Sequence, residues 1–231
     1  MKKFLALFAA LTLAACSGDD DKNEVKQNKF VSTITVSYAD TPEDVEVLTF
    51  LYDDQKHVKS IVDSDETFAA FTYQGDNLVS IADDDTAEAQ YNFTYANDIF
   101  SGYSSFGELI PITHNAQANT YTLANSGAVL YVSGRDVGKI VEADGTVNIE
   151  VTYDTSKKGA LYNVPGNNLF VLTAFSQLYP YISSQAMTSI TESSFKYTAN
   201  NTYDNDGYIS KSILTSTDGV VFTLSYTYKA L

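Results

Sequence analysis

The sequence predicts a mainly all-β protein: an antiparallel meander of hairpin repeats, curved or partly closed into a barrel-like sheet, with one short helix. Three observations lead to this prediction. Strand-forming residues dominate the middle of the chain, which has 17 Tyr and 13 Phe in total but only 4 Pro. A tyrosine-led motif returns at nearly constant spacing. Dipeptides that favour tight turns separate the strand-like runs.

The motif is a tyrosine followed by polar turn residues and then by apolar residues. Its copies, some of them loose, begin at Tyr52, Tyr73, Tyr95, Tyr131, Tyr153 and Tyr203. The first two steps are 21 and 22 residues, and the step from 131 to 153 is 22 residues. A unit of this length holds two strands of about eight residues and two turns. Each unit is therefore predicted to be a β-hairpin.

Residue alternation within the units agrees with strands. Phe71 and Tyr73 are predicted to point to one face of a strand and Thr72 to the other, and residues 93–95 repeat this pattern. Asp-Gly dipeptides stand between strand-like flanks at 144–145, 206–207 and 218–219. These dipeptides are among the strongest short-range signals for a tight turn.

One stretch departs from strand spacing. In residues 168–185, apolar residues recur three or four positions apart, at 169, 172, 175, 178 and 182. An asparagine at 167–168 can cap the start of a helix, and Pro180 can kink or end it. We expect one short helix here, packed on the sheet. Residues 104–118 are expected to form a longer loop with a short strand near Ile110.

The N-terminus has the features of a signal peptide. Two lysines precede an apolar run over residues 4–15, which is too short to span a bilayer as a permanent helix. The sequence Leu13-Ala14-Ala15-Cys16 resembles the lipobox of bacterial lipoproteins, in which the thiol is lipidated and a peptidase cuts before the cysteine. The resemblance implies a signal peptide over 1–15, cleavage between Ala15 and Cys16, and lipid attachment at Cys16. The alternative is an ordinary secretory signal with a chance cysteine.

A polar stretch follows the cysteine. Residues 16–28 contain almost nothing to bury, so we expect a lipid-anchored acidic linker, followed by a single β-rich domain over 29–231. The aspartates at 19–21 resemble the acidic export signal of Bacteroidota lipoproteins, which directs them to the outer face of the outer membrane. A generic acidic linker is the alternative.

Charge and cysteine content exclude several classes of function. The chain has 14 Lys and Arg against 29 Asp and Glu, a net charge of −15, and loss of residues 1–15 would make it −17. Nucleic acid would be repelled by such a chain, so nucleic-acid binding is excluded. Cys16 is the only cysteine, so neither an intrachain disulfide nor a cysteine-based metal site can form.

The hairpins resemble those of a known family. Residues 71–81 read Phe-Thr-Tyr-Gln-Gly-Asp-Asn-Leu-Val-Ser-Ile, and further matches lie at 166–169, 203–208 and 222–228. They are similar to a family of Bacteroidota lipoproteins whose domain has no known function and a porin-like fold. The resemblance covers residues 45–231 and is weakest over 100–150. It implies a fold and no catalytic residues.

Two acidic clusters contain residue types that can bind a metal ion. Asp204, Asp206 and Gly207 imitate the middle of a calcium-binding loop, but its first and twelfth ligand positions would fall on Thr202 and Ile213. A hairpin turn is therefore expected. The three aspartates at 83–85 are expected to form a solvated turn. We accordingly expect neither a metal site nor a cofactor.

No catalytic motif accompanies the histidines. His57 is placed at a hairpin tip and His114 in the long loop, and no nucleophile elbow, phosphate-binding loop or His-Glu-x-x-His sequence is present. We interpret both histidines as structural. The tyrosines are expected to pack in the core or to pair across strands, with an exposed sugar-stacking or protein-binding patch as the alternative.

Taken together, these features predict a surface-exposed lipoprotein, attached to the membrane through its lipid anchor, with a non-enzymatic binding or structural role at the cell envelope. The expected ligand is a protein or a glycan. The alternative is a small carboxylate-dependent hydrolase acting on envelope or extracellular polymers. A third reading, a membrane-spanning barrel, requires a continuous apolar band facing lipid.

Overall fold

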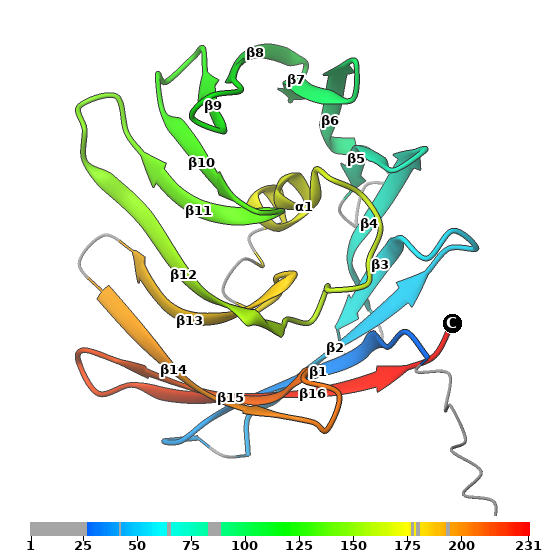
Figure 1. Ribbon diagram of the computed structural model, residues 1–231, viewed down its shortest axis with the longest axis vertical. Coiled ribbons are helices and arrows are strands. Elements are labelled where there is room, and N and C mark those ends of the chain that lie inside the picture. The colour runs from blue at the N-terminus through cyan, green and yellow to red at the C-terminus, as the bar shows by residue number, and fades with distance from the viewer. Residues whose placement is uncertain are drawn as a thin grey trace, which may run out of the picture.

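The computed structural model describes residues 27–41, 43–63, 66–82, 89–176, 178, 181–192 and 195–231. These residues form an antiparallel barrel of short hairpins around one helix (Figure 1). The strands of the first half are β1 (Phe30–Tyr38), β2 (Val45–Tyr52), β3 (Val58–Asp63), β4 (Glu66–Gln74), β5 (Asn77–Ala82), β6 (Ala89–Ala96), β7 (Ile99–Ser105) and β8 (Glu108–Asn115). Those of the second half are β9 (Thr120–Leu123), β10 (Val129–Ser133), β11 (Asp136–Val141), β12 (Val147–Lys158), β13 (Gln185–Glu192), β14 (Phe195–Tyr203), β15 (Ile209–Ser216) and β16 (Val221–Lys229).

Each strand pairs with its neighbours in sequence, and β1 also pairs with β16, which closes the barrel. The predicted antiparallel meander is thus confirmed, and the sheet is closed. Because consecutive strands run in opposite directions, the connecting turns alternate between two ends. We call the end where β1 begins, at Phe30, the proximal end. The end that carries the β1–β2 turn, residues 39–44, is the distal end.

The repeated tyrosines mark β-bulges at the proximal rim. The pairing register of β2 with β3 shifts next to Tyr52, and equivalent shifts lie next to Tyr73 and Tyr95. The late copies at Tyr153 and Tyr203 also adjoin a shift. A bulge bends its strand and increases local twist, which a sheet needs in order to close on itself. The sequence repeat is therefore a repeat of bulged hairpins.

Tyrosine hydroxyls also tie neighbouring strands together at this rim. They donate to main-chain carbonyls one strand earlier, at 2.7–2.8 Å, in the pairs Tyr52 to Val31, Tyr95 to Leu78, Tyr153 to Val137 and Tyr228 to Ile209. A buried tyrosine needs a partner for its hydroxyl. The expectation that tyrosines pack in the core or pair across strands is confirmed for these residues.

Two of the hairpin turns are built alike. The Asp53 side chain accepts hydrogen bonds from the amides of Gln55 and His57, and the Asp204 side chain does the same for the amides of Asp206 and Tyr208. This is the local bonding that makes aspartate a turn former. The residue before the last turn position has a positive φ in both, +72° at Lys56 and +82° at Gly207.

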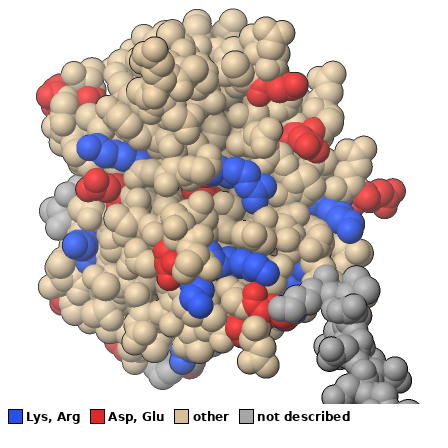
Figure 2. All heavy atoms as spheres, viewed as in Figure 1, with Lys and Arg blue, Asp and Glu red and all other residues tan. Residues whose placement is uncertain are grey.

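The inner wall of the barrel is apolar, and the outer wall differs between strands. Inward-facing residues such as Ile34, Phe50 and Leu224 are buried. On β2 the outward-facing Val45, Val47 and Leu51 are apolar and exposed. Outward-facing positions of β6 and β14 are polar and exposed: Asn92, Thr94, Lys196, Thr198, Asn200 and Thr202. On these two strands the alternation is the reverse of the apolar-out pattern of transmembrane barrels. Figure 2 looks down the ring of strands, as Figure 1 does, and shows charged side chains of both signs on that end of the molecule.

The lumen is filled by the segment between β12 and β13. Its helix, α1 (Leu169–Phe175), lies inside the ring of strands (Figure 1). Leu161, Phe170 and Leu172 from this segment are at most 1% exposed. No helix among the described residues is long and apolar enough to cross a bilayer.

The predicted short helix is confirmed, and it packs on the inner face of the sheet, which closes around it. It ends at Phe175, earlier than the apolar spacing over 168–185 indicated. Leu178 and Ile182 follow the helix in the sequence and are also buried, because the barrel encloses them. Pro180 lies outside the described residues. Asn168 occupies the N-cap position but makes no side-chain cap.

Asp136 fastens the end of the lumen segment to the wall. Its buried carboxylate accepts hydrogen bonds from the amide and hydroxyl of Ser184, both at 2.7 Å, and from the amide of Gln185 at 3.2 Å. Burial raises the pKa of Asp136, against the lowering effect of these bonds and of Arg135. Nearby, a side chain on Gly159 would collide with backbone atoms of Ser183 and Gln185. The segment leaves and rejoins the wall at a tightly fitted point.

The loop expected over 104–118 is wrong. Strands β7 and β8 are joined by a tight turn in which Phe106 and Gly107 have φ of +50° and +82°. Ile110 and Ile112 face the lumen, on either side of Pro111. The proline hid this alternation in the sequence because proline is unusual within a strand. His114 consequently lies in a strand and not in a loop.

Candidate functional site

Several of the predicted site residues are not among the residues that the structure describes. Ala15 and Cys16 of the lipobox, and the aspartates at 83–85, lie outside the described residues. Within the described residues, no group of three or more His, Cys, Asp or Glu side chains is placed to hold a metal ion. Among the described residues, the candidates for a functional site are therefore the histidines, the turn at Asp204 and the hollows of the barrel.

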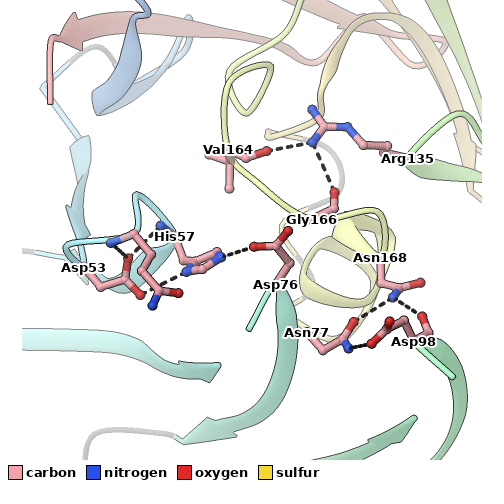
Figure 3. Close-up of polar contacts among 10 residues, drawn as sticks. Asp53, His57, Asp76, Asn77, Asp98, Arg135, Val164, Gly166 and Asn168 are labelled. Carbon is pink, nitrogen blue, oxygen red and sulfur yellow. Dashed lines mark hydrogen bonds and ion pairs between the residues drawn. The ribbon is translucent and has the colours of Figure 1, made fainter. Parts of the chain in front are cut away.

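His57 is a buried residue that links two turns of the proximal end. Its ring is 0% exposed and stacks on Tyr73 with ring centres 4.5 Å apart. Its Nδ1 lies 3.0 Å from a carboxylate oxygen of Asp53, and its Nε2 lies 3.1 Å from one of Asp76 (Figure 3). Burial tends to raise the pKa of Asp53, but hydrogen bonds and charge from His57 outweigh burial and lower it. The placement at a hairpin tip is confirmed, and both ring nitrogens are occupied.

The turn at Asp204 holds a lysine. Lys29 Nζ lies 2.8 Å from Asp204 and 2.6 Å from Asp206. Hydrogen bonds to these two carboxylates raise the pKa of Lys29. The expected hairpin turn is confirmed, and its carboxylates are bound to an ammonium group of the chain itself.

Arg135, the only arginine of the sequence, closes the proximal end. Its guanidinium donates to the carbonyls of Val164 and Gly166 at 2.7 and 3.2 Å, and to that of Tyr162 at 2.7 Å. Figure 3 shows this contact beside the bonds of Asn168, which donates to Asn77 and to the carbonyl of Asp98. The segment that crosses the proximal end is thus hydrogen-bonded to three turns.

The described part of the distal end contains two hollows, and we call the larger of these two the wide hollow. It has a volume of about 420 Å³ and is lined by Glu46, Phe68, Ala69, Ile81, Ala82, Gln90, Phe175, Ser176, Leu178 and Tyr181. A mostly apolar hollow with a few convergent polar groups is the usual form of a small-molecule site. Its floor comes from the lumen segment and its sides from β2, β4, β5 and β6.

Two polar groups in the wide hollow are suited to a ligand. The Ser176 side chain is only 8% exposed, and its Oγ has no hydrogen-bond partner among the described residues. An unpartnered buried hydroxyl is costly unless something binds it. Glu46 faces inward, and burial together with the charge of Asp63 raises its pKa. The hollow thus offers a hydroxyl and a carboxyl group.

A second hollow of about 210 Å³ lies on the other side of Tyr181, and we call it the aromatic hollow. It is lined by Tyr38, Tyr181, Ile190, Glu192, Tyr197, Leu214, Val220 and Phe222. Phe222 is central, because its ring lies 6.1 Å from that of Tyr38, 5.7 Å from that of Tyr197 and 6.4 Å from that of Tyr181. The two hollows share Tyr181 as a common wall.

Charge is distributed unequally between the ends. Among the described residues in the distal turns, or within two residues of them, the acidic ones are Asp40, Glu43, Asp44, Glu46, Asp63, Glu66, Glu108, Glu142, Asp144, Glu192 and Asp218. The basic residue in the same set is Lys196. By the same rule the proximal end has seven acidic residues, Asp53, Asp54, Asp76, Asp98, Asp136, Asp204 and Asp206, and seven basic ones, Lys29, Lys56, Lys59, Arg135, Lys157, Lys158 and Lys229. The hollows therefore lie in a strongly negative field.

Sequence reasoning missed these hollows. Their aromatic residues are spread over most of the chain, and none stands in a recognisable motif: Tyr38, Phe68, Phe175, Tyr181, Tyr197 and Phe222. The available signal was weak: aromatic residues and inward-facing carboxylates, Glu46 and Glu192, near strand ends that meet at the same rim.

Comparison with known proteins identifies no family. No protein-family model matches the sequence. No curated protein matches it either. Among solved structures, the chain is similar to one described as a porin-like protein from Bacteroides uniformis ATCC 8492, with 12% identity and a TM-score of 0.44. The alignment covers 86% of this chain and 98% of that one.

Proposed function

We propose that this protein is a surface-exposed lipoprotein of the outer membrane that binds a ligand, without turnover, in the hollows of its distal end. The observation that carries the proposal is the wide hollow, with a mostly apolar lining and a buried Ser176 hydroxyl that has no hydrogen-bond partner among the described residues. Large apolar side chains also stand exposed around the distal turns, and Phe106 is 94% exposed. Such groups are typical of binding surfaces.

The position of the chain start supports this arrangement. The first strand begins at the proximal end, so a lipid on Cys16 would tether that end to the membrane. The linker expected over residues 16–28 would join that lipid to the first strand. The hollows, at the opposite end, would then face away from the membrane and toward a ligand from outside.

The binding proposal is tested by thermal shift. The full chain is screened against a panel of oligosaccharides, peptides and small neutral, cationic and anionic compounds. A ligand at about 100 times its Kd stabilises by about 2.7 kcal/mol, which is roughly 5–10 °C in Tm for a chain of this size. We expect at least one compound to produce such a shift.

Two tryptophan variants locate the binding. Gln90 stands at a β-bulge of β6 and lines the wide hollow, whereas Asn92 lies on the exposed outer face of the same strand. Gln90→Trp is expected to abolish the shift and Asn92→Trp to preserve it. The proposal fails if no compound shifts the wild type, or if both variants respond alike.

The anchor is tested separately. Cys16→Ser is expected to move the protein from the membrane fraction to the soluble fraction, and the wild type is expected to be degraded by protease added to intact cells. Retention of Cys16→Ser in the membrane fraction would contradict lipid attachment at Cys16.

One observation favours a second function, hydrolysis by carboxylates. Glu46 lines the wide hollow, and burial and the charge of Asp63 raise its pKa, as in a general acid. This reading expects release of sugar or peptide fragments from a polymer panel, and loss of that release in Glu46→Gln. Fragment release that survives in Glu46→Gln would exclude this residue.

A further inference from the structure

The aromatic hollow is lined by four aromatic rings that are set at large angles to one another. The ring of Phe222 is inclined by 41° to Tyr38, by 68° to Tyr197 and by 65° to Tyr181. Faces of aromatic rings are electron-rich and attract cations within about 6 Å. A volume of about 210 Å³ is smaller than the roughly 300–1,000 Å³ of drug-sized sites, so the hollow suits a compact head group.

Negative charge borders the same rings. Glu192 lines the hollow, and Glu46 lines the wide hollow on the other side of Tyr181. Burial raises the pKa of the Tyr181 hydroxyl, and the charges of Glu46 and Glu192 add to the increase. Both carboxylates are thus close enough to act on this tyrosine, which stays neutral between them.

The wider field agrees with the local one. Within the described distal turns and their flanking residues, Lys196 is the basic side chain among many acidic ones. An anionic ligand would be repelled on approach and a cationic one attracted. Rings and carboxylates together form the arrangement with which proteins recognise organic ammonium ions.

We infer that the aromatic hollow binds the ammonium group of an organic cation, with Tyr38, Tyr181, Tyr197 and Phe222 around it and Glu192 as its counter-charge. This inference rests on the proposed function, because it names the ligand class for the same distal site. The ammonium group can belong to a free small molecule or to a methylated lysine of a peptide, and the test separates these sources.

Isothermal titration calorimetry on the full chain provides the test. The probes are choline, its uncharged tert-butyl analogue, and a short peptide with a trimethylated lysine. We expect choline or the peptide to bind at least tenfold more tightly than the uncharged analogue, and the affinity to fall as salt is added. Tighter binding of choline would indicate a small molecule, and tighter binding of the peptide would indicate a protein ligand.

Variants separate the hollow from the general field. Glu192→Gln is expected to weaken binding of the cation about tenfold, as is Tyr197→Leu, which keeps an apolar side chain but removes the ring. Glu108→Gln removes one charge from the distal end, on β8 rather than in the hollow, and is expected to change the affinity less than twofold. Folding of each variant is checked by circular dichroism.

Three results would overturn the inference: equal affinity for choline and its uncharged analogue, no binding of either cation, or equal effects of Glu192→Gln and Glu108→Gln. None of these decides the thermal-shift test with Gln90→Trp. A ligand of another class whose binding requires the wide hollow would support the proposed function, even if the inferred ammonium site were disproved.

Discussion

The two ends of this barrel are made from the same hairpins but are finished differently. At the proximal end, turn aspartates, His57 and Arg135 are joined by hydrogen bonds to one another and to the lumen segment. At the distal end, the described residues leave two hollows around Tyr181, and acidic side chains outnumber basic ones. The proximal turns also border a hollow of about 480 Å³, lined mostly by polar residues of β4, β5, β6 and the β6–β7 turn. The two ends therefore differ in charge and in the chemistry of their hollows.

This difference shows how a closed barrel can combine stability with a binding site. Polar groups at the proximal end are held by partners within the chain, so removing them should cost stability. At the distal end, the inward-facing carboxylate of Glu46 stands close to the like charge of Asp63, so removing it should cost little or even stabilise. Binding sites are commonly less stable than other parts of a protein. The predictions below compare the two ends on this basis.

The largest effect is expected in the lumen. Phe170 is 1% exposed and packs on Tyr121 at a ring distance of 4.8 Å. Phe170→Ala should lower the free energy of unfolding by about 3–5 kcal/mol. Phe222→Ala, at the half-buried aromatic hollow, should cost about half as much. Urea unfolding measures both, and equal losses would contradict the view that the distal aromatics are kept for binding rather than for stability.

A smaller loss is expected at the fastening of the lumen segment. Asp136→Ala leaves the Ser184 amide, its hydroxyl and the Gln185 amide without their acceptor. The cost should be about 2–3 kcal/mol by urea unfolding. Asp54→Ala, at an exposed position of a proximal turn, is the control and should change little. A similar result for the two variants would mean that Asp136 does not hold the segment.

An effect of about 0.5–1 kcal/mol, with a defined pH dependence, is expected for the turn that holds Lys29. Burial opposes the lowering of the Asp204 pKa, but hydrogen bonds from Lys29, Tyr208 and Asp206 outweigh it. The stabilisation is therefore complete above the ordinary pKa of 3.8 and is lost as pH falls through the lower folded pKa. Asp204→Asn should be less stable than wild type at neutral pH, and the difference should vanish in strong acid. A difference that persists there would exclude an ionic cause.

The smallest effect, of opposite sign, is expected at the distal end. Burial and Asp63 raise the pKa of Glu46, so its ionised form destabilises the folded state at neutral pH. Glu46→Gln should therefore stabilise by about 0.5 kcal/mol at pH 7. The gain should disappear as pH falls through the folded pKa toward the ordinary value of 4.5. A loss of stability in Glu46→Gln would show that this carboxylate is structural, like those of the proximal end.

The strands could be predicted because their signals are local. Tyr52, Tyr73 and Tyr95 mark bulges, and Asp-Gly dipeptides mark turns, through bonds that reach only a few residues along the chain. Where a local signal was ambiguous, the prediction failed. Pro111 concealed the full extent of β8, of which only a short strand near Ile110 was predicted, and the apolar spacing continued past Phe175, where α1 ends.

By itself, the sequence determined a meander of tyrosine-bearing hairpins, one interrupting helix and a strongly acidic chain. It also predicts the lipobox at Cys16, whose chemistry depends on adjacent residues only. Tertiary structure alone decided that β1 meets β16, that α1 lies within the lumen, and that Tyr38, Tyr181, Tyr197 and Phe222 surround one hollow. The physical reason is the range of the interactions: turns and bulges form between neighbours in sequence, whereas closure and cavities depend on contacts between residues more than a hundred positions apart.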